Sequence, residues 1–154
     1  MVQFVTLTRE NLNNPDVLRA IDENRVVLVV GENWTKPLVR KIMPTMRVCE
    51  RYLSAECNRK YVRLVIEAIV TERHDECEMY LDSETRRCKF LCHILGSMLE
   101  YGIFKCSAND LAKAIRSMFA YTQDTMKRYI NEGRSCGYVE IIRTFDKSIP
   151  NNPA

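Results

Sequence analysis

Glycine and proline are scarce in this chain, with five of each among 154 residues. Two of the prolines, Pro150 and Pro153, belong to the last few residues, so the body of the chain has even fewer turn-forming residues. A sandwich or barrel of many short strands needs frequent turn residues, and this composition excludes such a fold. Hydrophobic residues make up 46% and charged residues 28%, a balance typical of a globular chain with a core. We therefore predict an all-α protein.

Long uninterrupted hydrophobic runs are also lacking. The longest apolar stretch, from Cys88 to Phe104, is broken by charged residues and is shorter than the roughly 20 residues of a membrane-spanning helix. The first residues, MVQFVTLTRE, have no charged start and no apolar run of signal-peptide length, and the last residues, DKSIPNNPA, are polar. We expect a cytosolic protein with no transmembrane anchor.

Catalytic residue patterns are missing as well. There are only two histidines, His74 and His93, and neither lies in a nucleophile motif. No glycine-rich phosphate loop occurs. We therefore predict that the protein is not an enzyme, needs no cofactor and works by binding another protein.

Cysteines, by contrast, are frequent. There are seven, an odd number, and we expect them to be reduced and to act as small core residues. A zinc site is the alternative, because His74 and Cys77 precede a second pair of thiols spaced one helical turn apart. The candidate zinc ligands are His74, Cys77, Cys88 and Cys92. A zinc-stabilised helical adaptor is thus one rival function.

Positive charge is present without being concentrated. Lysine and arginine total 23 against 20 acidic residues, and they are spread from Arg9 to Lys147. DNA-binding proteins usually gather such residues on one face or one helix. In the helix predicted over 108–131 these basic residues are scattered, at Lys113, Arg116, Lys127 and Arg128. We expect no nucleic-acid partner, and a DNA-binding helical adaptor remains the second rival.

Helix signals divide the first half of the chain. Asn14 followed by Pro15 predicts a helix over 15–30 that ends at Gly31, although the β-branched VVLVV run leaves a strand as the alternative there. Thr35 is expected to cap a helix from residue 36 that breaks at Pro44. A restarted helix carries Met46, Cys49, Leu53 and Cys57. The next carries Tyr61, Val62, Val65, Ile66, Ile69 and Val70, with a bend over 71–78 and a short helix around Met79.

The segment 86–105 is apolar in nearly all directions around a helix, which predicts a central helix buried on every side. Ser107 and Asp110 resemble a capping box for a helix over 108–131, which Gly133 should end. A last helix is expected near 137–146. Together these predict one domain over 1–154, with a core of about 15–146 and a polar tail of 147–154. Its architecture is an all-α bundle of seven to eight helices around the central one.

Near the C-terminus, YINEGRSCGYVEIIRTF (129–145) resembles the second homology region of the Bcl-two family of apoptosis regulators. Tyr129 to Glu132 match the opening of that region, and Gly137 with Tyr138 stand where the family has Gly-Trp. Upstream, Arg86 to Lys89 occupy the first homology region's signature, just before the central helix, in a degraded form. Such degraded motifs are similar to those of viral pro-survival members from large DNA viruses.

This resemblance implies a Bcl-two-like fold and an inhibitor of apoptosis. Such a protein sequesters the amphipathic BH-three helix of pro-apoptotic host proteins in a hydrophobic groove. The groove would be formed by Leu53, Tyr61, Leu64, Met79, Leu91 and Cys92, with Tyr138 and Phe145 closing one end. Either Lys89 or Arg87 would pair with the partner's aspartate. The resemblance also implies the host cell cytoplasm, including peripheral attachment to mitochondria, and leaves homodimer formation open.

Overall fold

The computed structural model describes residues 3–7, 14–23, 26–30 and 35–148. Within these ranges there are eight α-helices and one two-stranded sheet. The helices are α2 (Pro15–Asp22), α3 (Lys36–Arg47), α4 (Arg59–Glu72), α5 (His74–Leu81), α6 (Glu84–Tyr101), α7 (Ala108–Ile115), α8 (Gln123–Gly133) and α9 (Tyr138–Ser148). Two 3-10 turns, η2 (Glu50–Tyr52) and η3 (Arg116–Met118), and the strands β1 (Gln3–Leu7) and β2 (Val26–Val30) complete the order. The number of helices agrees with the prediction for a helical bundle.

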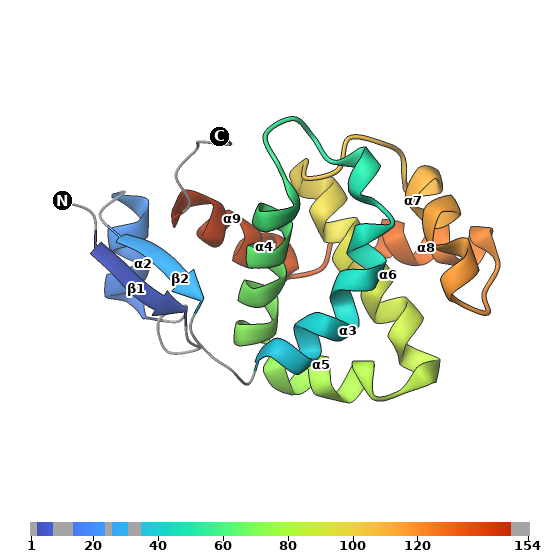
Figure 1. Ribbon diagram of the computed structural model, residues 1–154, viewed down its shortest axis with the longest axis horizontal. Coiled ribbons are helices and arrows are strands. Elements are labelled where there is room, and N and C mark those ends of the chain that lie inside the picture. Colours follow the sequence, from blue (N-terminus) through green and yellow to red (C-terminus); the bar gives the residue numbers. More distant parts are fainter. Residues whose placement is uncertain (1–2, 8–13, 24–25, 31–34, 149–154) are drawn as a thin grey trace.

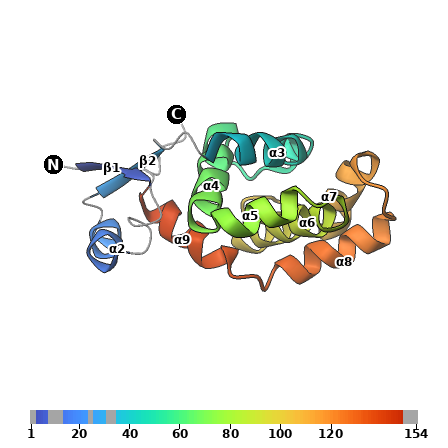
Figure 2. The same cartoon turned by 90° about the horizontal axis from the view of Figure 1, so that it is seen from below.

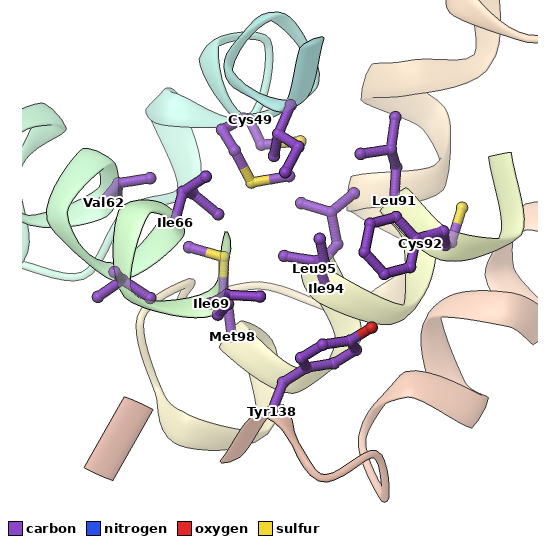
Figure 3. Packing of buried hydrophobic residues seen from close by; sticks show 14 of the residues in the cluster. Cys49, Val62, Ile66, Ile69, Leu91, Cys92, Ile94, Leu95, Met98 and Tyr138 are labelled. Carbon is purple, nitrogen blue, oxygen red and sulfur yellow. The ribbon is translucent and has the colours of Figure 1, made fainter. Parts of the chain in front are cut away.

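Helix α6 is the centre of the bundle, as its sequence predicts. Ten of its residues are buried: Cys88, Phe90, Leu91, Cys92, Ile94, Leu95, Gly96, Ser97, Met98 and Leu99. They meet the buried face of α4, where Ile66 and Ile69 point toward Leu95 and Met98 (Figure 3). Gly102 ends the helix in the left-handed conformation, at φ 89°, which glycine adopts without a steric cost. One hydrophobic cluster extends from Ala20 of α2 to Ile142 of α9.

The bundle is layered around this helix. Figure 2 shows α3 on one side of α5 and α6, and α8 on the other side. Helix α6 packs most extensively on α8. This contact is very close: a Cβ added at Gly96 would lie 1.8 Å from the Ile130 carbonyl oxygen, and one at Gly133 would lie 2.4 Å from the His93 carbonyl oxygen. The hydroxyl of Ser97 donates to the Gly133 carbonyl over 2.7 Å. Glycine on both helices is therefore what lets the two backbones approach.

The predicted break at Pro44 is wrong, because α3 continues through this residue to Arg47. A proline inside a helix removes one backbone hydrogen bond and crowds the preceding turn. Pro44 is exposed, and so is Arg40, the residue whose carbonyl loses its helical partner. Met43 and Met46, on either side of it, are buried, and their packing holds the helix. Thr35 occupies the N-cap position, as expected, but its side chain makes no capping hydrogen bond.

The restarted helix predicted beyond Pro44 is also wrong. Cys49 is followed by the 3-10 turn η2, after which Leu53 is extended and forms an isolated antiparallel bridge with Phe104. The Ser54 amide donates to the Ile103 carbonyl, and the Lys105 amide donates to the Tyr52 carbonyl. These long-range backbone bonds satisfy the chain without a helix. They join this segment to the C-terminal end of α6.

Helix α4 confirms the predicted apolar face, since Val62, Val65, Ile66, Ile69 and Val70 are all buried. The predicted bend is narrower than 71–78. It consists of Arg73 alone, which ends α4 and precedes α5 with a φ of −119° and a ψ of 39°. Helix α5 contains Met79, as expected.

The helix predicted over 108–131 is divided in two. The capping box of Ser107 and Asp110 is present and starts α7, but η3 and a loop separate α7 from α8. Thr122 starts α8 as its N-cap residue, because its hydroxyl accepts a hydrogen bond from the Thr125 amide. Gly133 is the last residue of α8, where a helix end is predicted. Helix α9 agrees with the predicted last helix and extends two residues further, to Ser148.

The N-terminal part departs most from an all-α protein. The helix predicted over 15–30 ends at Asp22, and Val26–Val30 forms strand β2, parallel to β1. Figure 1 shows this small sheet with α2 at one end of the molecule, next to α9. The β-branched VVLVV run prefers an extended backbone, and this preference exceeds the helix signal from Asn14 and Pro15. Gly31, the predicted stop, and the tail beyond Ser148 lie outside the described residues.

All seven cysteines are free, and Cys49, Cys77, Cys88 and Cys92 are buried. Burial raises the pKa of the Cys49 and Cys77 thiols to about 12. Because only the thiolate reacts and the reagent cannot reach a buried sulfur, we expect these four thiols to resist alkylation at pH 8 until the protein unfolds. Only Cys57, Cys106 and Cys136, which are partly exposed, should react in the folded protein. Mass spectrometry of iodoacetamide-treated protein tests this, and early modification of Cys92 would contradict it.

Candidate functional site

The residues predicted to form the groove do not line one open surface. Leu91 and Cys92 are fully buried in the core. Leu53, Tyr61 and Leu64 are partly buried and pack on the edge of the same cluster. A partner could touch Leu91 or Cys92 only after a neighbouring helix has moved.

Two of the predicted groove residues, Leu53 and Met79, lie at opposite ends of α6. Leu53 pairs with Phe104, just beyond the C-terminal end of α6. Met79 belongs to α5, which comes before the N-terminal end of α6, and is 49% exposed. The rise of 1.5 Å per residue makes α6 itself about 27 Å long. These residues therefore form two separate areas.

The two candidate cations differ in their surroundings. Lys89 is exposed, and its Nζ lies 5.6 Å from the centroid of the Tyr129 ring of α8. Arg87 is partly buried, and its Nε is a buried atom without a hydrogen-bond partner. Neither side chain forms an ion pair with any of the described residues. Both therefore keep a positive charge that no carboxylate of the described chain neutralises.

Lys89 also lies on an unexpected side of the central helix. Its contact with Tyr129 places it toward α8, whereas α3 covers the other side of α6 (Figure 2). The predicted groove between α3, α4, α5 and α6 therefore does not contain this cation. The surface that does contain it runs along the N-terminal half of α6, between α5 and α8.

Tyr138 is buried and acts as a structural link. Its hydroxyl donates to Glu76 Oε1 over 3.2 Å, and the Arg73 guanidinium lies 4.7 Å from its ring centroid. Burial, followed by the nearby Glu76 charge, raises the pKa of the Tyr138 phenol. The predicted partner of Tyr138 at the groove end, Phe145, lies in α9, but its side chain is outside the described residues.

A chain of aromatic rings, which the sequence does not reveal, connects α5, α6 and α9. Tyr80 stacks on Phe90 with centroids 5.2 Å apart, and Phe90 meets Tyr138 edge to face at 5.9 Å. Tyr80 is also faced by Arg86, at 6.0 Å from the ring centroid. The signal available in the sequence was the pair of aromatic residues at 80 and 90, which belong to consecutive helices. Nothing in their spacing shows that Tyr138 completes the chain.

The predicted zinc ligands are not brought together. Among the described residues, the only group with ligand atoms close enough to share an ion is His74, Asp75 and Glu78. In this group the two ring nitrogens of His74 face different carboxylates, Nδ1 toward Asp75 at 3.6 Å and Nε2 toward Glu78 at 3.5 Å. One ion could not use both contacts. Cys88 and Cys92 instead hydrogen-bond to one another, which lowers the pKa of Cys88 and raises that of Cys92.

The predicted DNA-binding helix is not a single element. Lys113 is on α7 and Arg116 is in η3, while Lys127 and Arg128 are on α8. A recognition helix needs its base-reading and phosphate-binding residues on one continuous face. The four cations are therefore not arranged as that alternative requires.

None of the helices in the described part of the chain combines the length and the hydrophobicity that a bilayer crossing requires. Comparisons with protein families, with curated proteins and with solved structures give no match for this chain.

Proposed function

We propose that this protein binds an amphipathic helix of a pro-apoptotic host protein and so inhibits apoptosis, in the host cell cytoplasm. The observation that carries the proposal is Lys89, an exposed cation with no ion pair to any described residue, held over the Tyr129 ring beside the central helix. A carboxylate of the partner would supply the negative charge that pairs with Lys89. The resemblance at 129–145 and at 86–89 supplies the class of partner.

The partner's apolar residues would add most of the affinity. Burying apolar surface contributes about 25 cal/mol per Å² before the costs of association. Met79 is exposed and precedes Tyr80, whose ring stacks on Phe90, the residue after Lys89. Contact with Met79 and with the exposed part of Tyr80 needs no change in the fold. Contact with Leu91 and Cys92 needs α3 or α5 to shift, and α5 is a short helix that buries only Cys77 and Leu81.

A panel of fluorescent peptides tests the proposal. Each peptide carries the amphipathic helix of one pro-apoptotic protein, and a scrambled version of each serves as its control. We expect at least one peptide to bind with nanomolar to low-micromolar affinity by fluorescence anisotropy. Binding of none below about 100 µM would reject the proposed function.

Lys89→Glu is expected to weaken binding of the best peptide at least about tenfold, because the partner's aspartate then faces a like charge. Lys89→Arg should preserve binding, since a guanidinium can pair with a carboxylate through two hydrogen bonds. Lys113→Glu, at an exposed cation on α7, is the matched control and should leave the affinity unchanged. Isothermal titration calorimetry measures these three variants and Arg87→Glu. Unchanged affinity for Lys89→Glu, with a loss for Arg87→Glu, would assign the aspartate to Arg87.

A further inference from the structure

We propose that the partner of this protein is an acidic helix with two carboxylates one turn apart, of which Lys89 binds one and Arg128 binds the other. The inference rests on the proposed function and adds a second charge contact, on α8. Its site is the cation–tyrosine surface, formed by Tyr80, Arg86, Lys89, Tyr121, Arg128 and Tyr129.

Tyr129 brings the two cations together. The Lys89 Nζ lies 5.6 Å from its ring centroid, and the Arg128 Cζ lies 5.4 Å from the same centroid. An aromatic ring attracts cations through its quadrupole, but it carries no net charge. The ring therefore positions both side chains and leaves their positive charges uncompensated.

The surroundings make this surface rigid. Tyr121 meets Tyr129 edge to face with centroids 6.2 Å apart, and its hydroxyl donates to the Thr85 carbonyl over 3.4 Å. These contacts tie the loop before α8 to the first turn of α6. A surface that is already ordered loses less conformational entropy when a partner binds.

Carboxylates near this surface do not cancel its charge. Arg86, Lys89 and Arg128 form no ion pair with any described residue. Glu132 pairs with His93 over 3.1 Å, and Asp82 pairs with Lys41 of α3. The remaining acids, Glu84 and Asp124, are in the first turns of α6 and α8, where the helix dipoles favour negative charge.

Lys89 and Arg128 both lie within 5.6 Å of one ring centroid, so a helix that carries paired acids can face both of them. Side chains four residues apart on a helix are separated by about 5–6 Å at Cβ and point the same way. Two such carboxylates could reach the two cations that contact this ring. A nucleic acid fits less well, because base stacking needs a free aromatic face. The Tyr129 ring is already in contact with Lys89, Arg128 and Tyr121.

The test uses a synthetic amphipathic helix of about 20 residues with leucines at helical spacing and one aspartate. Four residues after the aspartate, one version carries glutamate and the other glutamine. We expect the protein to bind the glutamate version about tenfold more tightly, as measured by fluorescence anisotropy at low salt. In Arg128→Ser this preference should disappear, while binding of the glutamine version is kept. Lys127→Ser, at the neighbouring exposed cation on α8, is the matched control and should keep the preference.

The outcomes separate this inference from the proposed function. If the unmodified protein binds the two versions with equal affinity, or if Arg128→Ser keeps the preference for the glutamate version, the second charge contact is overturned. The proposed function then still stands on the peptide panel. If neither version nor any peptide of the panel binds, both fail. If a uridine oligonucleotide binds more tightly than either peptide version and this binding is lost in Arg128→Ser, the surface is assigned to single-stranded nucleic acid. This result also overturns the inference. Thermal melts of each variant confirm that the fold is intact.

Discussion

Replacing Gly96 with alanine is expected to lower the free energy of unfolding by about 3 kcal/mol or more. The new Cβ would lie 1.8 Å from the Ile130 carbonyl oxygen and 2.9 Å from the Ile130 carbonyl carbon. Both are backbone atoms of α8, so no side chain can rotate away, and α6 and α8 must separate. Overpacking a core already costs about 1–3 kcal/mol when side chains can adjust. Urea unfolding followed by circular dichroism measures the change.

Gly102→Ala is the control for this prediction. It places the same methyl group just beyond the C-terminal end of α6, where nothing lies within 4 Å. The φ of 89° costs an alanine about 1–2 kcal/mol, because its Cβ crowds the adjacent backbone, and this cost involves no other helix. If the two variants lose the same stability, the close approach of α6 and α8 is not what Gly96 provides.

Phe90→Ala is expected to cost about 3–5 kcal/mol, the usual range for removing a buried phenylalanine. Phe90 is 4% exposed and is the middle ring of the chain that runs from Tyr80 to Tyr138. Its loss should loosen α5 and α9 together, because each is attached to α6 through this ring. Urea unfolding gives the cost, and near-ultraviolet circular dichroism reports the released tyrosines.

Phe119→Ala is the matched control, since Phe119 is only partly buried, in the loop after η3. It should lose clearly less stability and leave the near-ultraviolet signal of Tyr80 and Tyr138 in place. A small loss for Phe90→Ala, similar to that for Phe119→Ala, would contradict the structural role of the ring chain.

The central helix could be predicted because its signal is local. Residues 86–105 are apolar around the whole helix, and such a segment has to be enclosed by other helices. The capping box at Ser107 and the end at Gly133 were also predictable, since each depends on a few neighbouring residues. Pro44 and the division at Thr122 were not. At Pro44, tertiary packing overrides the local signal for a break. At Thr122, one capping hydroxyl starts a second helix within what the sequence pattern predicts as a single helix.

The candidate site was less predictable than the fold. That Lys89 is exposed follows from its charge, but its position against Tyr129 depends on how α8 packs on α6. This packing is set by Gly96 and Gly133, which lie 37 residues apart in the sequence and meet only in the fold. Leu91 and Cys92 were expected on a groove floor, and burial of the same residues in a closed core satisfies the same pattern. Periodicity identifies an apolar face, but it does not show whether a partner or another helix of the same chain covers it.

Hydrogen–deuterium exchange with and without a bound amphipathic peptide tests the central claim most directly. If the partner helix binds along the N-terminal half of α6, exchange should slow in α5, in residues 84–93 and in α8. It should remain unchanged in α2 and in η2. Slower exchange confined to α2 and α9, or no change at a saturating peptide concentration, would contradict the account.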